Sequence, residues 1–180
     1  MKLSRRARIA TTGAVLAAVA ATAFGAVSAN ASAPVVAATA AAAPGSTTTT
    51  THLTTDAATR AAQAALDAAE REGQRVTVAV VDRNGNTVVT LRGDRAGPQS
   101  YESAERKAFT AVSWNAPTSE LAGRLQQAPN LKDIPGTLFL AGGVPVEARN
   151  APVAGIGVAG APSGDLDEKF ARAGAAALAR

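Results

Sequence analysis

The chain has 180 residues, none of which is cysteine, and its only histidine is His52. Without cysteine the protein can form neither disulfides nor thiolate zinc sites, and it has no thiol nucleophile. Aromatic residues make up only 3% of the sequence, so the core must be built mainly from small aliphatic side chains. His52 is the only strong nitrogen ligand that the chain offers to a metal.

Acidic residues are absent from the first 51 positions, where the only charges are those of Lys2, Arg5, Arg6 and Arg8. The whole chain has 18 basic and 14 acidic residues, so removing these four basic residues leaves 14 of each sign in the rest. Nucleic-acid binding depends on an excess of lysine and arginine that neutralises phosphates. We therefore expect no nucleic-acid partner.

The N-terminus has the composition of an export signal. A basic start precedes an apolar segment, residues 9–27, and Ala29-Asn30-Ala31 has the small-x-small form of a cleavage site. These features predict a signal peptide over residues 1–31 and a secreted protein, either extracellular or associated with the cell wall. The Ser4-Arg5-Arg6 triplet also fits the twin-arginine route, so both export routes stay open.

Residues 32–51 are rich in alanine, proline and threonine and end in a run of threonines. Such low-complexity sequence buries too little apolar surface to offset the loss of chain entropy, which predicts a disordered tether. Residues 52–180 remain as one domain. That length is sufficient for a single hydrophobic core.

Periodicity and turn residues predict a domain of the α+β class. Alanine-rich and capped segments predict helices over residues 55–72, 100–115, 118–127 and 166–179. Apolar, β-branched runs predict strands over residues 76–82, 87–91, 137–141, 144–149 and 153–158. Asn84-Gly85 is a typical hairpin turn between the first two strands. The order αββααβββα with short connections predicts an antiparallel five-stranded sheet flanked by helices.

Three pairs of acidic residues have the spacing that places two carboxylates on one helix face: Asp67 with Glu70, Glu102 with Glu105, and Asp165 with Glu168. Carboxylate oxygens are suitable ligands for a hard cation such as ferric iron. Glu102 and Glu105 are our preferred metal ligands, with His52 as a further candidate. The alternative for Glu102 is an i,i+4 ion pair with Arg106 at the start of a helix.

Three other features have a structural and a functional interpretation. The glycine-rich segment at residues 155–160 lacks the Lys-Ser/Thr ending of a phosphate loop, so it predicts a strand that another backbone or a flat ligand approaches closely. His52 is either a mobile residue at the end of the tether or a metal ligand. Thr137 is either the first residue of a strand or a ligand contact.

Four segments carry a resemblance to the GlcG/HbpS family. They are VAVVDRNG at residues 78–85, SAERKAFTA at 103–111, IPG with AGGVP at 134–136 and 141–145, and VAGIGVAG at 153–160. The resemblance covers residues 54–179. It implies a five-stranded antiparallel sheet between helices, assembly into octamers, and binding of haem and iron in the cell envelope. It also implies a role as the redox-sensing accessory component of a two-component system, with a membrane sensor histidine kinase as partner.

Residue by residue, the resemblance matches Glu102 and Glu105 to an iron-binding acidic motif and Thr137 to a haem-contacting threonine, with Thr110 as the second choice. A haem-degrading enzyme and a generic small-molecule-binding domain are the two alternative functions. The family includes members with different ligands, so the fold alone does not decide between these alternatives.

Overall fold

The computed structural model describes residues 39–179. The expected signal peptide and the first part of the expected tether lie outside this range. Residues 39–51 are exposed and contain no helix or strand, and the folded unit begins at Thr47. No helix in the described part of the chain is both long enough and apolar enough to cross a membrane.

The folded unit contains four α-helices and four strands within the described range. In chain order they are α1 (Thr55–Arg71), β1 (Thr77–Asp82), β2 (Thr87–Arg92), α2 (Gln99–Trp114), α3 (Thr118–Arg124), β3 (Gly143–Ala148), β4 (Ala151–Ala159) and α4 (Gly164–Ala176). Short 3-10 helices follow α3 at Pro129–Asp133 and α4 at Ala177–Ala179. The expected helix over residues 118–127 therefore ends earlier, at Arg124.

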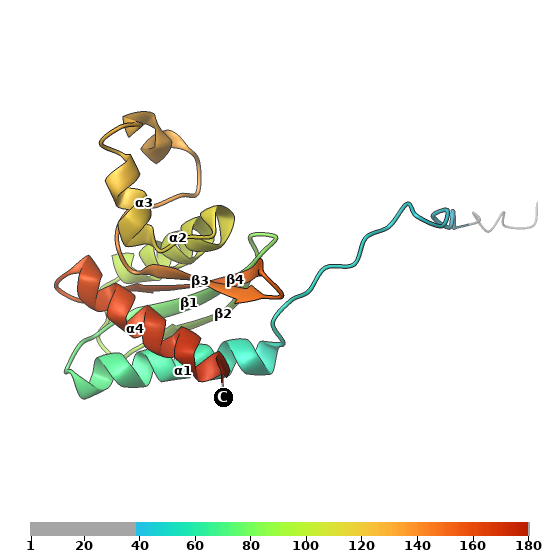
Figure 1. The fold of residues 1–180 in the computed structure, drawn as a ribbon. Coiled ribbons are helices and arrows are strands. Elements are labelled where there is room, and N and C mark those ends of the chain that lie inside the picture. The colour runs from blue at the N-terminus through green and yellow to red at the C-terminus, as the bar shows by residue number, and fades with distance from the viewer. Residues whose placement is uncertain (1–38, 180) are drawn as a thin grey trace, which may run out of the picture. The chain divides into compact units, whose positions relative to one another are not determined.

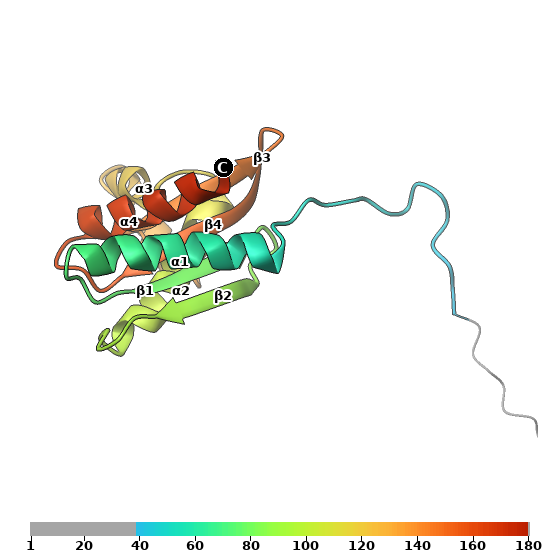
Figure 2. The same ribbon diagram turned by 90° about the horizontal axis from the view of Figure 1, so that it is seen from below.

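The strands form one antiparallel sheet in the order β2-β1-β4-β3. Helices α1 and α4 lie side by side on one face of the sheet and α2 covers the other face, as Figures 1 and 2 show. The predicted α+β class and antiparallel arrangement are confirmed. The predicted number of five strands is wrong, because the sheet of the described residues has four.

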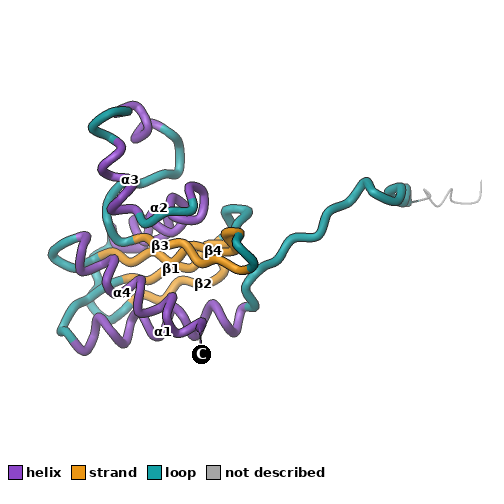
Figure 3. Tube along the Cα trace, viewed as in Figure 1, coloured by secondary structure: helices purple, strands orange, loops and turns teal. Residues whose placement is uncertain are grey.

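The missing strand is the one expected over residues 137–141, which form an irregular loop before β3 (Figure 3). Its backbone groups bind to side chains of α2 instead of to a neighbouring strand. The amide of Leu138 donates to the Thr110 hydroxyl at 2.7 Å, and the carbonyl of Thr137 accepts from the Arg106 guanidinium at 2.7 Å. Helix side chains thus satisfy the hydrogen bonds of these two backbone groups, which therefore do not need a partner in the edge strand β3.

The main core lies between the sheet and the α1–α4 layer. Alternating valines of β1 and β4, together with Ile156, meet the alanines of α1, and the largest side chain there is Phe170 of α4. Gly174 of α4 lies against the carbonyl of Ala61 in α1, where a side chain would not fit. Small residues thus let the two helices approach closely within one chain, so these alanines form a core.

The opposite face of the sheet shows why β4 is rich in glycine. A Cβ atom at Gly155 would overlap the carbonyl oxygen of Ala108, and one at Gly157 would overlap the carbonyl oxygen of Ala104. Helix α2 therefore packs with its backbone directly on the backbone of β4. The prediction of a strand that another backbone approaches closely is confirmed.

The local signals at turns and helix ends are mostly confirmed. The hairpin between β1 and β2 turns at Gly85, whose φ is +86°, and Thr54 and Ser163 cap α1 and α4 through their hydroxyls. The start of α2 differs from the prediction. Ser100 lies inside the helix, where its buried hydroxyl contacts that of Thr77 at 2.7 Å.

Candidate functional site

His52 lies beside the β1–β2 hairpin. Its Nδ1 atom is 3.6 Å from Oδ2 of Asp82, the last residue of β1, and its Nε2 atom is 2.7 Å from the Thr50 hydroxyl. The side chain of His52 remains 35% exposed. The ring therefore lies next to the hairpin carboxylate, at a distance slightly longer than a hydrogen bond.

Asp82 is itself held in place by the hairpin turn. Its Oδ1 atom accepts hydrogen bonds from the amides of Asn84 and Asn86 at 2.8 and 2.9 Å. Burial alone would raise the pKa of the Asp82 carboxyl, but the hydrogen bonds from Asn86 and Asn84 outweigh it and lower the pKa. The group is thus a fixed carboxylate that faces the imidazole.

Phe109 of α2 connects this hairpin to the loop that carries Thr137. Its ring fills the space beside Gly85 on one side and lies close to Gly136 on the other. We call the surface formed by His52, Asp82, Gly85, Phe109 and Gly136 the hairpin end. Within it, His52 lies beside Asp82 of the hairpin, and Phe109 lies between Gly85 and Gly136, the residue before Thr137.

The two candidate threonines are buried and use their hydroxyls within the chain. The Thr110 hydroxyl donates to the carbonyl of Arg106 and accepts from the amide of Leu138, both at 2.7 Å. The Thr137 hydroxyl donates to the carbonyl of Ile134 at 2.7 Å. Thr137 therefore keeps free acceptor capacity for a ligand, whereas Thr110 already acts as both donor and acceptor.

Glu102 and Glu105 lie in the first half of α2. Glu102 has a side chain 76% exposed and forms the expected ion pair with Arg106, at 3.5 Å. Glu105 is half-buried and accepts a hydrogen bond from Thr90 of β2 at 3.2 Å. The described residues contain no group of three or more acidic or histidine side chains that could hold a metal ion, so any cation bound here needs further ligands.

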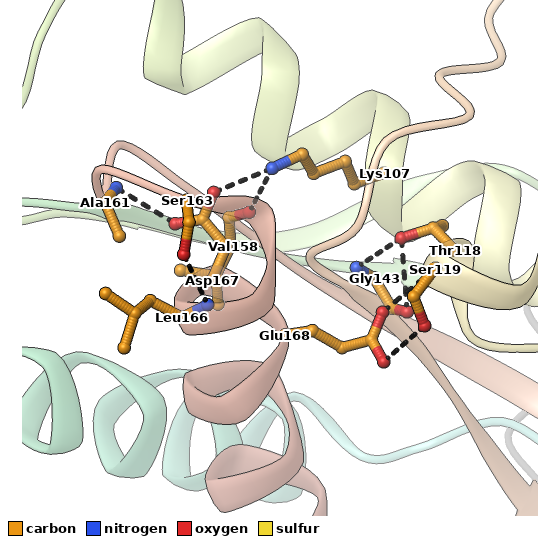
Figure 4. A network of polar contacts seen from close by, with 10 residues as sticks. All are labelled: Lys107, Thr118, Ser119, Gly143, Val158, Ala161, Ser163, Leu166, Asp167 and Glu168. Atoms are coloured by element: carbon orange, nitrogen blue, oxygen red, sulfur yellow. Dashed lines mark hydrogen bonds and ion pairs between the residues drawn. The ribbon is translucent and has the colours of Figure 1, made fainter. Parts of the chain in front are cut away.

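In each of the other two acidic pairs, one residue has a structural partner. Asp67 accepts from Gln63 at 2.6 Å. Glu168 accepts from the amide and hydroxyl of Ser119, at the start of α3 (Figure 4). It also pairs with Arg172. Burial raises the pKa of the Glu168 carboxyl, but these hydrogen bonds from Ser119 and Arg172 lower it overall.

Sequence reasoning missed a buried ion pair between Lys107 of α2 and Asp167 of α4. The ammonium and a carboxylate oxygen are 2.8 Å apart, and the two residues are only 5% and 3% exposed. Burial raises the pKa of Asp167, which the charge of Lys107 offsets only in part. A signal was present, because Lys107 lies on the same helix face as the buried residues Ala104, Ala108 and Ala111.

The ion pair lines a pocket of about 540 Å³. The pocket opens between the start of α2, the loop at residues 138–141 and the turn from β4 into α4. Its volume lies within the range of about 300–1,000 Å³ that is usual for small-molecule sites. We call it the Lys107 pocket. None of the preferred haem or metal ligands lines it, although Asp165 of the third acidic pair does.

A four-stranded antiparallel sheet between two helical layers, with a histidine beside a carboxylate at one end and a charged pocket at the other, makes this a small α+β domain with two candidate ligand sites. Residues 53–176 match the family described as "Haem degrading protein HbpS-like". Since the match covers more than half of the chain, the protein belongs to the HbpS-like family.

Three solved structures are similar to this chain. HbpS is 78% identical, with a TM-score of 0.76, and the match covers 77% of this chain and 99% of that one. A double mutant of HbpS from Streptomyces reticuli, in which two glutamates three positions apart are replaced by aspartate, is 77% identical with a TM-score of 0.78, covering 79% and 97%. The PduOC–haem complex is 26% identical with a TM-score of 0.65, covering 71% and 95%. Among curated proteins, no sequence matches this chain.

Proposed function

We propose that this protein binds haem and ferric iron. The observation that carries the proposal is the match of residues 53–176 to a haem-degrading family, together with a relative that was solved as a haem complex and is covered over 95% of its length. The geometry of the hairpin end supports it. This surface combines an imidazole with an aromatic side chain, and both are suited to a flat iron-containing ligand.

The chemistry of His52 fits an axial ligand of haem iron. A ligating histidine usually has one ring nitrogen fixed by a carboxylate, so that the other nitrogen is free for the metal. In this protein Asp82 faces Nδ1, and the partly exposed ring leaves Nε2 with only the exposed Thr50 hydroxyl to displace. Of the three candidate contacts, His52 is therefore the one best placed to reach iron.

Thr137 is the proposed second contact with haem. The Phe109 ring fills the space between the hairpin and Gly136, which precedes Thr137. We propose that a flat ligand held at His52 also reaches this loop. Thr110 is less suited to the role, because it has no exposed surface and its hydroxyl already has two partners.

Glu102 and Glu105 are the proposed ferric iron ligands. They are the only two glutamates in the chain separated by three positions, which is the spacing of the two glutamates replaced in the double mutant of HbpS. Ionised carboxylates are acceptors only, as a hard cation requires. Because two oxygens do not complete a coordination shell, water or another side chain must supply the rest and the affinity should be modest.

Replacing both glutamates with glutamine is expected to abolish most of the iron uptake and leave the fold intact. The change removes two negative charges while keeping side-chain size, and the exposed ion pair and helix-dipole contributions lost are each at most about 1 kcal/mol. A ferric iron titration checks the uptake, and circular dichroism checks the fold. The matched control is Asp67→Asn with Glu70→Gln on α1. Equal iron uptake by the parent and the Glu102/Glu105 variant would remove these residues from the site.

We further propose that the protein is exported, assembles into a homo-oligomer, with the octamer as the expected size, and acts with a membrane sensor histidine kinase as a redox-sensing accessory protein. Iron held by a few exposed oxygens exchanges readily, so its occupancy can follow the redox state of the surroundings. An exported protein that carries such iron can report oxidising conditions to a membrane partner. The proposed signal peptide at residues 1–31 supports this placement.

Haem degradation is the second candidate function, and the description of the matching family favours it. Incubation of the haem complex with ascorbate in air separates the two functions. A binding protein keeps its haem spectrum with a constant stoichiometry. A haem-degrading enzyme loses the haem absorbance and releases iron together with an open-chain tetrapyrrole.

A further inference from the structure

The Lys107 pocket plays no part in the proposed haem and iron sites. It lies where β1 begins and β4 ends, because Thr77 pairs with Ala159 and Ala159 lines the pocket. His52 lies at Asp82, five residues further along β1. At about 3.4 Å per residue, the two regions are roughly 17 Å apart along the strand.

The buried ammonium of Lys107 has one N–H group more than its partners use. It donates to Asp167 at 2.8 Å and to the carbonyl of Val158 at 3.1 Å (Figure 4). An ammonium has three N–H donors, and no other acceptor for Lys107 is found among residues 39–179. Since Lys107 lines the pocket, the third donor is available to a ligand there.

The surrounding backbone is shaped to admit this ammonium. Gly142 has a φ of +131°, and a Cβ atom there would collide with the Lys107 ammonium at 2.6 Å. The carboxylate of Asp167 is fixed in turn by the amide of Ala161 at 3.0 Å. A buried ion pair contributes little net stability compared with an apolar pair of the same size, so stability alone does not explain charges in the wall of a pocket.

The walls of the pocket combine a polar end, where Lys107 lies with the carboxylates of Asp165 and Asp167, with an apolar side. The N-terminal ends of α2 and α4 both border it, and α2 has no side chain capping its first amides. Both helix ends add partial positive charge to that of Lys107. Leu138, Leu140 and Pro162 form an apolar side, and Leu140 is 56% exposed.

We propose that the Lys107 pocket binds the carboxylate of an organic acid that has an apolar body. The carboxylate accepts the third N–H of Lys107, and the apolar body packs against Leu138 and Leu140. Asp165 and Asp167 also line the pocket and oppose any negative charge, so the ligand must bring its single carboxylate to the free N–H of Lys107 and gain the rest of its affinity from its apolar body. A free monocarboxylic acid and one propionate group of haem share this chemistry.

The test is a titration of the ¹⁵N-labelled, haem-free protein with butyrate, benzoate and 4-phenylbutyrate, followed by NMR. Saturable shifts of the Gly160 and Ala161 amides are expected with at least one acid, and none with 4-phenylbutyramide, which has the same apolar body without the charge. The absence of saturable shifts with all three acids, or equal shifts with the amide, would overturn the proposal.

Ser103→Asp provides the variant, because Ser103 lines the pocket and the new carboxylate repels the ligand without unpairing Asp167. We expect affinity to fall at least about tenfold, which corresponds to about 1.4 kcal/mol. Ser113→Asp adds the same charge to an exposed position ten residues further along α2 and should leave binding unchanged. Equal affinity of the Ser103 variant and the parent would also overturn the proposal.

The source of the carboxylate is decided by repeating the titration on the protein loaded with haem. If haem prevents the probe from binding, the pocket takes a haem propionate. If the probe binds equally well, the pocket takes a free acid. The double variant Lys107→Met with Asp167→Leu removes both charges together. It is expected to fold and to lose binding of the carboxylate probe, whether the natural ligand is a haem propionate or a free acid.

Discussion

Replacing Gly157 with alanine is expected to destabilise the folded unit by about 3 kcal/mol. The new methyl group would collide with the carbonyl oxygen of Ala104 and the amide of Ala108, and neither backbone group can move without shifting α2 away from the sheet. Overpacking of this kind typically costs about 1–3 kcal/mol, and a collision with helix backbone should lie at the upper end. Urea unfolding followed by circular dichroism measures the loss.

Gly123→Ala is the matched control for this change. Gly123 lies in α3, and a Cβ atom there has no neighbour within 4 Å. The same chemical change should therefore be neutral or stabilise the protein by up to about 1 kcal/mol through helix propensity. If the Gly157 and Gly123 variants had equal stability, α2 would not pack on the backbone of β4 as the structure shows.

Replacing His52 with alanine is expected to weaken haem binding by about 100-fold and to shift the Soret band. The variant removes the only imidazole in the chain, and no other side chain offers iron a comparable nitrogen ligand. A 100-fold loss corresponds to about 2.7 kcal/mol of binding free energy. The fold should be intact, because His52 is largely exposed and contributes nothing to the core.

Thr137→Ala, measured in the same titration, separates the two proposed contacts. It removes one buried hydroxyl that donates to the carbonyl of Ile134 and should change haem affinity less than His52→Ala does.

Asp82→Asn should also weaken haem binding less than His52→Ala does, because it only removes the negative charge beside the ring. If Thr137→Ala alone shifted the Soret band, the threonine would be the iron contact and His52 would not.

Local sequence signals were sufficient to predict most of the fold. Asn84-Gly85 indicated the hairpin, and the alanine-rich, capped segments indicated the helices. These features depend on residues close together in the chain, and their physical causes act locally. The antiparallel arrangement followed from the short connections between strands.

The error over residues 137–141 had a non-local cause. Their composition favours a strand, but the hydroxyl of Thr110 and the guanidinium of Arg106 satisfy the backbone from a helix about 30 positions earlier. Nothing in the segment itself reveals these partners. Tertiary contacts overrode local propensity at this position.

The candidate site shows the same division between local and non-local information. The spacing of Glu102 and Glu105 could be identified from the sequence alone. The same is true of His52, which is the only histidine. The contact of His52 with Asp82 and the pairing of Lys107 with Asp167 join residues 30 and 60 positions apart. Such pairs depend on the tertiary structure, so the sequence alone does not predict them.

The most direct test of the proposed function is a titration of the mature protein with haem, followed through the Soret band. Saturation at a fixed number of haem molecules per chain, with a band shifted from that of free haem and altered again by His52→Ala, is the result that we predict. A spectrum that stays that of free haem at every ratio would contradict haem binding and leave a small α+β domain with a different ligand.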